Sequence, residues 1–153
     1  MAETQLFLLD SNAFDLVIQY PKLIETLNEL HSSGRISLLF THIQYQELCG
    51  VFHKGDVDRF QEMMCVPGIN TPIYGVVLGK TPFGLAMWSD SESASRVQDT
   101  TPKNLNDCLL IETALHYGAT LVTDDDRFQK RASKGNAKWI CNSEFVDMFL
   151  SNE

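Results

Sequence analysis

Four acidic residues in this sequence occupy positions from which they could bind a metal ion together: Asp10, Glu47, Asp107 and Asp125. Carboxylate oxygens are hard ligands that suit Mg²⁺ or Mn²⁺, and the sequence has no Cys-x-x-Cys or His-x-x-x-His pair that would indicate zinc. A cluster of carboxylates raises its own pKa values unless a cation neutralises it. One or two such ions can activate a water molecule and stabilise the departing oxygen in phosphodiester hydrolysis. The acids therefore predict metal-dependent hydrolysis.

The elements that must position these acids alternate between strand and helix. Short apolar runs predict the strands, and they lack the period-two alternation of a half-exposed sheet, which is typical of a sheet covered on both faces. The predicted strands are Gln5–Leu9, Ile36–Phe40, Ile73–Leu78, Ala119–Thr123 and a strand around Lys138–Cys141. The expected fold is a three-layer α/β/α domain with a central, mainly parallel sheet.

Capping signals predict where the helices begin and end. Pro21 opens a helix that Gly34 ends, and Thr41 forms a capping box with Gln44 for the helix that carries Glu47. Further predicted helices are a short one capped by Asp56, one capped by Asn104 and closed by Gly118, a basic one from about Arg127, and a last one that contains Phe145 and Phe149.

The predicted elements bring the acids to one edge of the sheet. In parallel α/β folds, ligands bind at the carboxyl ends of the strands. Asp10 follows the first strand directly, and Asp125 comes two residues after Ala119–Thr123. Asp107 lies in the first turn of the helix that leads to that strand. Three of the acids are thus expected on the same edge, and Glu47 is within reach of it.

Each acid also has a purely structural explanation. Asp10 would cap the following helix, Glu47 would be a solvated helix residue, and Asp107 would complement the helix dipole. The run Asp124–Asp126 would be a solvated turn in which Asp126 caps the next helix. Each explanation stays open for a single residue, but the four acids together at these places are harder to explain in this way.

Longer motifs around the acids resemble the PIN-domain nuclease family, which includes the VapC-type toxins of toxin–antitoxin pairs. The matching segments are Leu8–Asn12, Asn106–Ala114 and Gly118–Phe128, together with Glu47 after the second strand. The resemblance lies in their order and spacing, since the family places an acid, then a helix, then a strand ending in Thr-x-Asp. It extends over roughly residues 5–50 and 103–150, whereas Pro67–Pro102 does not align.

The resemblance implies a divalent-metal-dependent endoribonuclease that acts on single-stranded or structured RNA. The residues implied are Asp10, Glu47, Asp107 and Asp125 for metal binding and catalysis, with Ser11, Asn12 and Thr123 as polar supports. Asp125 is preferred because it fits Thr-x-Asp, and Asp124 and Asp126 are the alternatives. The implied cofactor is one or two ions of Mg²⁺ or Mn²⁺, and the implied partners are RNA, a cognate antitoxin and a second copy of the chain in a homodimer.

The net charge of the 153-residue chain is −8, which by itself would disfavour a polyanionic ligand. Between Arg127 and Lys138, however, five residues are basic and none is acidic. We therefore expect contacts to the RNA backbone from Arg127, Lys130, Arg131 and Lys134. A solvated helix face is the alternative explanation of these charges.

Length and composition predict a single domain over residues 1–153, with an irregular insertion or loop region at residues 79–102. No apolar run approaches the roughly 20 residues that a bilayer requires, and the amino terminus does not resemble a signal peptide. The four cysteines are scattered along the chain, so reduced thiols and a cytoplasmic location are expected.

Two other functions agree with part of the pattern. A PIN-like scaffold would bind RNA or protein without cleaving, or with weak activity, although all four acids are present. A Mg²⁺-dependent phosphatase of the haloacid-dehalogenase type also begins with an Asp after the first strand, but it needs a second Asp two positions later as general acid. This chain has Asn12 at that position, so the nuclease is favoured.

Overall fold

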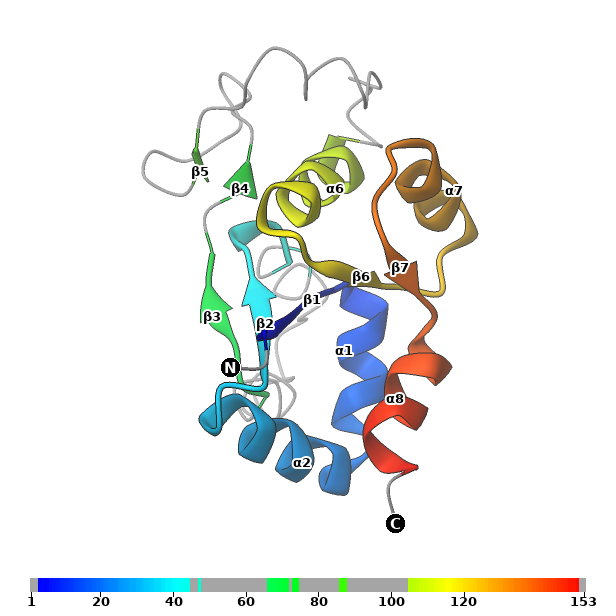
Figure 1. Cartoon of the computed structure of the whole chain (residues 1–153). Coiled ribbons are helices and arrows are strands. Elements are labelled where there is room, and N and C mark those ends of the chain that lie inside the picture. Colours follow the sequence, from blue (N-terminus) through cyan, green and yellow to red (C-terminus); the bar gives the residue numbers. More distant parts are fainter. Residues whose placement is uncertain are drawn as a thin grey trace, which may run out of the picture.

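The computed structural model describes residues 3–44, 47, 66–71, 73–74, 86–87 and 105–151. Within these residues, five strands form a parallel sheet in the order β3-β2-β1-β6-β7 (Figure 1). The strands are β1 (Gln5–Leu9), β2 (Ile36–Phe40), β3 (Ile69–Asn70), β6 (Thr120–Val122) and β7 (Trp139–Ile140). The first strand is central, and its Leu8 pairs with Leu39 of β2 on one side and Leu121 of β6 on the other.

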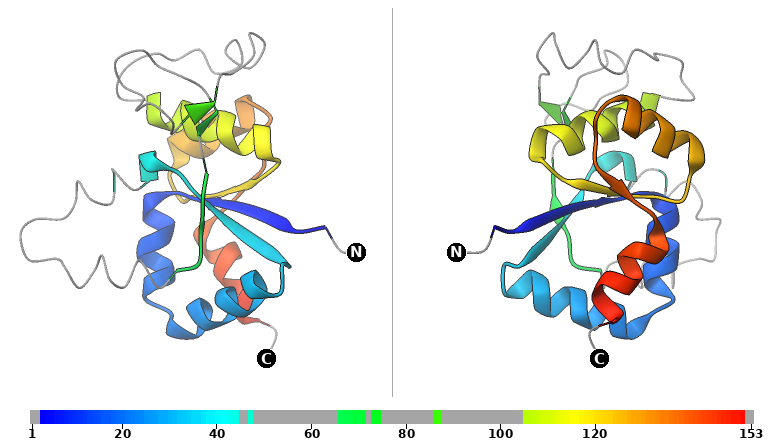
Figure 2. Two further views of the ribbon diagram at one scale, coloured as in Figure 1. Left: turned by 90° about the vertical axis from the view of Figure 1, so that its left-hand side faces the viewer. Right: turned by 45° about the vertical axis from the view of Figure 1, so that its right-hand side comes forward.

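Helices cover both faces of this sheet (Figure 2). The helices are α1 (Ser11–Ile18), α2 (Pro21–Ser32), α6 (Leu105–Tyr117), α7 (Asp126–Lys134) and α8 (Asn142–Leu150). One face is covered by α1, α2 and α8, and the other by α6 and α7. The predicted three-layer α/β/α fold with a parallel sheet is therefore confirmed.

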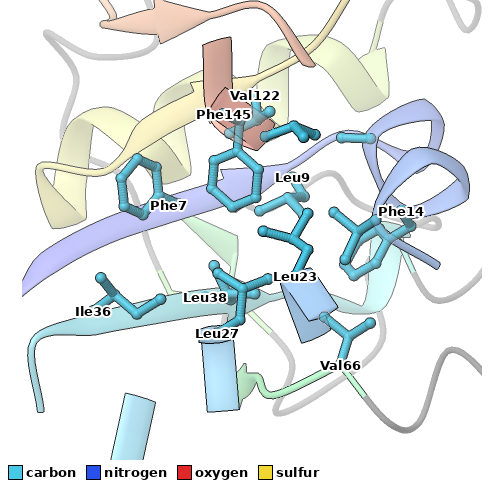
Figure 3. Close-up of a cluster of buried hydrophobic side chains, with 13 residues drawn as sticks. Phe7, Leu9, Phe14, Leu23, Leu27, Ile36, Leu38, Val66, Val122 and Phe145 are labelled. Carbon is cyan, nitrogen blue, oxygen red and sulfur yellow. The ribbon is translucent and has the colours of Figure 1, made fainter. Parts of the chain in front are cut away.

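The side chains of β1 show why both faces need a cover. Because successive strand residues point to opposite faces, Phe7 and Leu9 enter the core formed with α1, α2 and α8, whereas Leu8 enters the core formed with α6 and α7. All three are buried. Figure 3 shows the first core, in which the ring of Phe145 from α8 packs edge-on against Phe7 with their centroids 5.3 Å apart.

Both boundaries predicted for α2 and the predicted end of α6 are confirmed, whereas Asn104, the predicted cap of α6, and the short helix predicted after Asp56 lie outside the described residues. Pro21 is the first residue of α2. A backbone N–H at this position has no hydrogen-bond partner within the helix, so its absence in proline does not weaken the helix. Gly34 follows the end of α2 with φ +71°, and Gly118 follows α6 with φ +69°. Glycine enters this left-handed region without the steric penalty of a side chain, so each residue ends its helix and turns the chain toward the next strand.

The third strand differs from its prediction. The edge strand of the main sheet is β3, whereas β4 (Ile73–Tyr74) pairs with β5 (Ala86–Met87) in a separate two-stranded sheet. The predicted strand Ile73–Leu78 is thus confirmed only at its first two residues, since 75–78 lie outside the described residues. Of the region 79–102 that was expected to be irregular, the structure describes residues 86–87, and these form a strand. No described helix has both the length and the apolar character needed to cross a membrane.

Candidate active site

Asp10 lies at the carboxyl end of the central strand, as predicted. Its backbone N–H donates to the carbonyl of Val122 at 2.9 Å, which ties the end of β1 to the end of β6. One oxygen of its carboxylate accepts from the backbone N–H of Ser11 at 2.8 Å, and the other accepts from the Thr123 hydroxyl at 2.9 Å. Asp10 also caps α1, so the structural explanation for this residue is correct as well.

Thr123 connects Asp10 to the start of α7. Its side chain is completely buried, and its hydroxyl oxygen accepts from the backbone N–H of Asp125 at 3.1 Å while its hydrogen is donated to Asp10. The hydroxyl therefore uses one donor and one acceptor function, as its chemistry allows. Gln129 holds the same residue from α7 by donating to the Thr123 carbonyl at 2.7 Å. The position of Asp125 relative to Asp10 is thus set by two hydrogen bonds of one side chain.

The three consecutive aspartates after β6 have different partners. Asp124 accepts from the backbone N–H of Asn142 at 2.8 Å and so supports the amino end of α8. Asp125 caps α7 by accepting from the backbone N–H groups of Arg127 and Phe128 at 2.8 and 3.1 Å. The capping role expected for Asp126 is therefore wrong, because Asp126 is the exposed first residue of the helix. Among the three, Asp125 is the one joined to the Thr123 network.

Glu47 reaches the site from a helical segment after β2. Residues 42–44 and Glu47 are helical, and the predicted capping box is formed in part, since Gln44 accepts from the backbone N–H of Thr41 at 2.6 Å. The amide nitrogen of the buried Gln44 also donates to the carbonyl of Leu9. That bond fixes the start of this helix to the end of β1, next to Asp10. Glu47 itself is half-buried and accepts from the side-chain amide of Asn106 at 3.2 Å.

Asp107 lies in the first turn of α6 and pairs with a residue of α7. A carboxylate oxygen of Asp107 is 3.3 Å from Nη1 of Arg131. The pair joins the two helices that cover this face of the sheet. Arg131 was predicted to contact RNA, whereas the structure places it on an acid of the site. The other three basic residues of that prediction are exposed on α7: Arg127, Lys130 and Lys134.

The electrostatics show that the four carboxylates share one environment. Burial raises the pKa of Asp10, and this rise is opposed mainly by the hydrogen bond from Thr123 and increased by the charge of Asp125. Burial also raises the pKa of Glu47, with Asp10 adding to the effect. For Asp107, burial raises the pKa from 3.8 to about 6; Arg131 opposes the rise, and the other three acids increase it. Ionising Asp10, Glu47 and Asp107 together is therefore unfavourable without added positive charge.

The carboxylate side chains of the site are suitable ligands for a hard divalent cation, but they lie too far apart to surround one. Within the part of the chain that the structure describes, no three acidic, histidine or cysteine side chains lie close enough to surround one ion. The carboxylates are instead occupied by Ser11, Thr123, Asn106, Arg131 and the amino end of α7. A divalent cation such as Mg²⁺ or Mn²⁺ would nevertheless neutralise the negative charge that burial makes unfavourable on Asp10, Glu47 and Asp107. Holding such an ion would require the carboxylates to move closer together.

The sequence predicted two polar neighbours of Asp10, Ser11 and Thr123, but it did not indicate the other polar side chains that contact the site. Ser11 is half-buried beside Asp10, whereas Asn12 is exposed on α1. Asn106, Gln129 and the contact of Gln44 with β1 were not predicted. Asn106 directly precedes Asp107 in the sequence, and this adjacency could have indicated that Asn106 lies near the site. The contacts of the two glutamines join residues of different elements, and no local pattern indicates them.

A comparison with protein-family models matches residues 85–134 to the PIN domain. This segment contains Asp107, Thr123, Asp125 and Arg131. The predicted PIN-domain resemblance is confirmed. No curated protein matches the chain, and the PIN match itself covers the α6-β6-α7 part of the site rather than the β1 part.

Solved structures share the fold along nearly the whole chain. The structure of PAE2754 from Pyrobaculum aerophilum is 14% identical with a TM-score of 0.57, over 97% of this chain and 99% of that one. VapBC2 from Rickettsia felis, bound to a DNA fragment from its promoter, is 14% identical with a TM-score of 0.53, over 90% of this chain and 98% of that one. VapBC-1 from nontypeable Haemophilus influenzae is 16% identical with a TM-score of 0.50, over 91% of this chain and 99% of that one.

Proposed function

We propose that this protein is a divalent-metal-dependent endoribonuclease that hydrolyses phosphodiester bonds of RNA, and that it acts as the toxin of a toxin–antitoxin pair. The observation that supports this best is the arrangement of four carboxylates from separate segments in one electrostatic environment at the end of the sheet. The PIN match over residues 85–134 supports the same conclusion independently.

In this proposal Asp10, Glu47, Asp107 and Asp125 hold Mg²⁺ or Mn²⁺. These carboxylates would hold the cation, which when bound would supply the positive charge needed to activate a water molecule and to stabilise the departing oxygen. Thr123 orients Asp10 through its hydroxyl, in the way that hydrogen-bonded neighbours orient metal ligands in general. Burial raises the pKa of Asp10 and of Asp107, so these carboxylates gain more from a neighbouring cation than solvated ones would.

The exposed basic residues of α7 give this site a surface for the RNA backbone. Arg127, Lys130 and Lys134 are exposed on the helix that Asp125 caps, so they can contact phosphates that flank the scissile bond. We further propose a protein antitoxin as partner, a homodimeric state and a cytoplasmic location. The two VapBC structures that share the fold support the first of these.

The experiment that tests the reaction is cleavage of end-labelled single-stranded RNA with Mn²⁺, with Mg²⁺ and with a chelator. We expect the unmodified protein to cleave only with metal, and Asp10→Asn and Asp125→Asn to be inactive while remaining folded by circular dichroism. Asp126→Asn is the matched control, since it removes the same charge from the neighbouring exposed residue and should retain cleavage.

Two results would contradict the proposal. Cleavage by Asp10→Asn at the parent rate would refute the site. Absence of both cleavage and saturable Mn²⁺ binding in the parent protein would favour the non-cleaving scaffold instead. The toxin assignment is tested separately, because expression of the active chain should arrest growth and co-expression of a small protein from the adjacent gene should relieve the arrest.

A further inference from the structure

The basic residues of the run Arg127–Lys138 are divided between the two faces of the sheet. Lys138 directly precedes β7, and its carbonyl accepts from the backbone N–H of Leu121 in β6 at 2.9 Å, so it already belongs to the ladder of the sheet. Its neighbours Ala137 and Trp139 pack in the core beneath α6 and α7. Because successive strand residues point to opposite faces, the exposed Lys138 side chain points to the face that α1, α2 and α8 cover.

The other basic residues of this run belong to α7, and three of them are exposed: Arg127, Lys130 and Lys134. At 3.6 residues per turn, these three side chains leave the helix within about 60° of its circumference. The buried residues Phe128 and Ala132 lie on the opposite side of the helix. The three exposed cations therefore form one stripe along the helix axis, which is named the α7 stripe.

The charge of the α7 stripe is not neutralised within the protein. The one acid of α7 is Asp126, in its first turn. Among the residues that the structure describes, no acid forms an ion pair with a side chain of the stripe. The whole chain has 20 acidic and 12 basic residues, and five of the basic ones lie in the run Arg127–Lys138. The stripe is thus a cationic surface on a protein that is otherwise strongly acidic.

The α7 stripe begins at the candidate site and leads away from it. Asp125 accepts from the backbone N–H of Arg127 at 2.8 Å, so the first cation of the stripe lies next to an acid of the site. Because β6 and β7 are parallel neighbours, α7 returns the chain from the carboxyl end of one to the start of the other (Figure 1). Lys134 follows Arg127 by about 10 Å along the helix, which is the length of about three nucleotides of a stacked strand.

A nucleic-acid backbone fits this stripe better than a protein surface does. A row of Lys and Arg side chains neutralises the regularly spaced phosphates of a polyanion, and the release of counterions provides the affinity. The centre of a protein interface is instead enriched in aromatic side chains and depleted in lysine. The apolar residues of α7, Phe128 and Ala132, are buried in the core, so the exposed side of this helix has no apolar residue to offer.

We propose that the α7 stripe is a track for the backbone of one RNA strand, which runs along the helix from the candidate site toward the amino ends of the strands. This inference rests on the proposed function, because it says where the substrate of that reaction lies. The protein alone makes these contacts, so RNA binds through the stripe without metal. The stripe leaves the site in one direction, so affinity depends on the length of RNA on one side of the cleaved bond.

The first test measures binding of a labelled single-stranded RNA in chelator, by fluorescence anisotropy over a range of salt concentrations. Each neutralised phosphate of a single strand contributes about −0.7 to the slope of log Kobs against log salt concentration, so three contacts predict a slope of about −2 for the parent. Lys134→Gln should bind about three- to tenfold more weakly at low salt, with a slope of about −1.4. Lys138→Gln is the matched control, since it removes the same charge from the same basic run on the other face of the sheet. Its affinity should stay within about twofold of the parent, with an unchanged slope.

The second test measures cleavage of RNA substrates that are lengthened on one side of the cleaved bond or on the other. We expect only one of the two extensions to lower KM. Lys134→Gln should abolish that decrease and leave kcat within about twofold of the parent, because its contact is equally strong in the ground state and the transition state. Lys138→Gln should retain the decrease. Circular dichroism of each variant verifies that it is folded.

The outcomes separate this inference from the proposed function. Cleavage by a parent protein that binds no RNA in chelator would overturn the track alone, and so would equal weakening in Lys134→Gln and Lys138→Gln. Unchanged binding by Lys134→Gln would also overturn it, and an acidic protein would then be the better partner for the stripe. Equal effects of the two extensions would overturn its one-sided course. Metal-free binding that Lys134→Gln weakens, in a parent that cleaves with neither Mg²⁺ nor Mn²⁺, would refute the proposed function and support the stripe as an RNA-binding surface.

Discussion

Replacing Asp107 with asparagine should make the metal-free protein more stable at pH 8. The pKa of Asp107 is raised from 3.8 to about 6 in the folded chain, first by burial and then by the neighbouring acids, against the opposing effect of Arg131. Between these two values the folded state keeps a proton that the unfolded state has released. Stability therefore falls as the pH rises from about 4 to about 6, and it stays lower above that range. Asparagine resembles the protonated carboxyl and does not ionise, so it avoids this loss.

The magnitude follows from the size of the pKa change. At about 1.4 kcal/mol for each tenfold change in acidity, a rise from 3.8 to about 6 corresponds to an upper limit of about 3 kcal/mol. The Asp107 side chain is 32% exposed, and solvent screening reduces the effect to about 1–2 kcal/mol. For a domain of this size, that gain corresponds to a melting temperature about 3–6 °C higher.

The assay is urea and thermal unfolding of both proteins in chelator, at several values between pH 4 and pH 8. The difference in unfolding free energy should open between about pH 4 and 6 and become constant above about pH 7. Asp126→Asn, which alters an exposed acid, should show no such pH-dependent gap. The reasoning would be refuted by an Asp107→Asn variant that is no more stable than its parent at pH 8, or by a gain that does not shrink toward pH 4. With Mn²⁺ added, the parent should gain more stability than the variant.

Three other substitutions test separate parts of the structure. Thr123→Val removes the buried hydroxyl between Asp10 and the Asp125 backbone, so the unfolding free energy in urea should fall by about 1–3 kcal/mol; recovery by Thr123→Ser is expected, and its failure would count against the hydrogen bonds as the cause. Asp124→Ala removes the support of α8 and should cost about 1 kcal/mol with Mn²⁺ affinity unchanged in calorimetry; a large loss of affinity would instead make Asp124 a ligand. Phe145→Ala leaves a cavity in a core where the Phe145 side chain is 1% exposed. The free energy of unfolding in urea should fall by about 3–5 kcal/mol, and a loss below about 1.5 kcal/mol would be incompatible with that packing.

Local signals were sufficient for the parts of the fold that depend on neighbouring residues. Proline at the start of α2 and glycine at the ends of α2 and α6 have conformational preferences that act within one turn of helix. The run Gln5–Leu9 is apolar at its centre because Leu8 enters one core while Phe7 and Leu9 enter the other. The position of Asp10 next to such a strand therefore predicted its place at the edge of the sheet.

Features that depend on distant partners were missed or misassigned. β3, β4 and β5 contain two residues each, which is too few to show a periodic pattern. Which strand each of them pairs with depends on tertiary contacts and not on local sequence. The three aspartates after β6 have the same intrinsic preference for capping. Their roles differ because Asp124 accepts a hydrogen bond from the backbone of Asn142, whereas the backbone N–H of Asp125 donates to the Thr123 hydroxyl. Whether an arginine of α7 faces water or an acid depends in the same way on how α6 and α7 pack.

The order of strands in the sheet has a consequence for the synthesis of the chain. The central strand β1 is made first, but its neighbour β6 begins more than a hundred residues later, at Thr120. The hydrogen bond from Thr123 to Asp10 spans 113 positions in the sequence. A ribosome must therefore release most of the chain before the two halves of the carboxylate cluster can meet. Until then one edge of β1 has no strand to pair with, and the nascent polypeptide cannot assemble the arrangement on which the proposed activity depends.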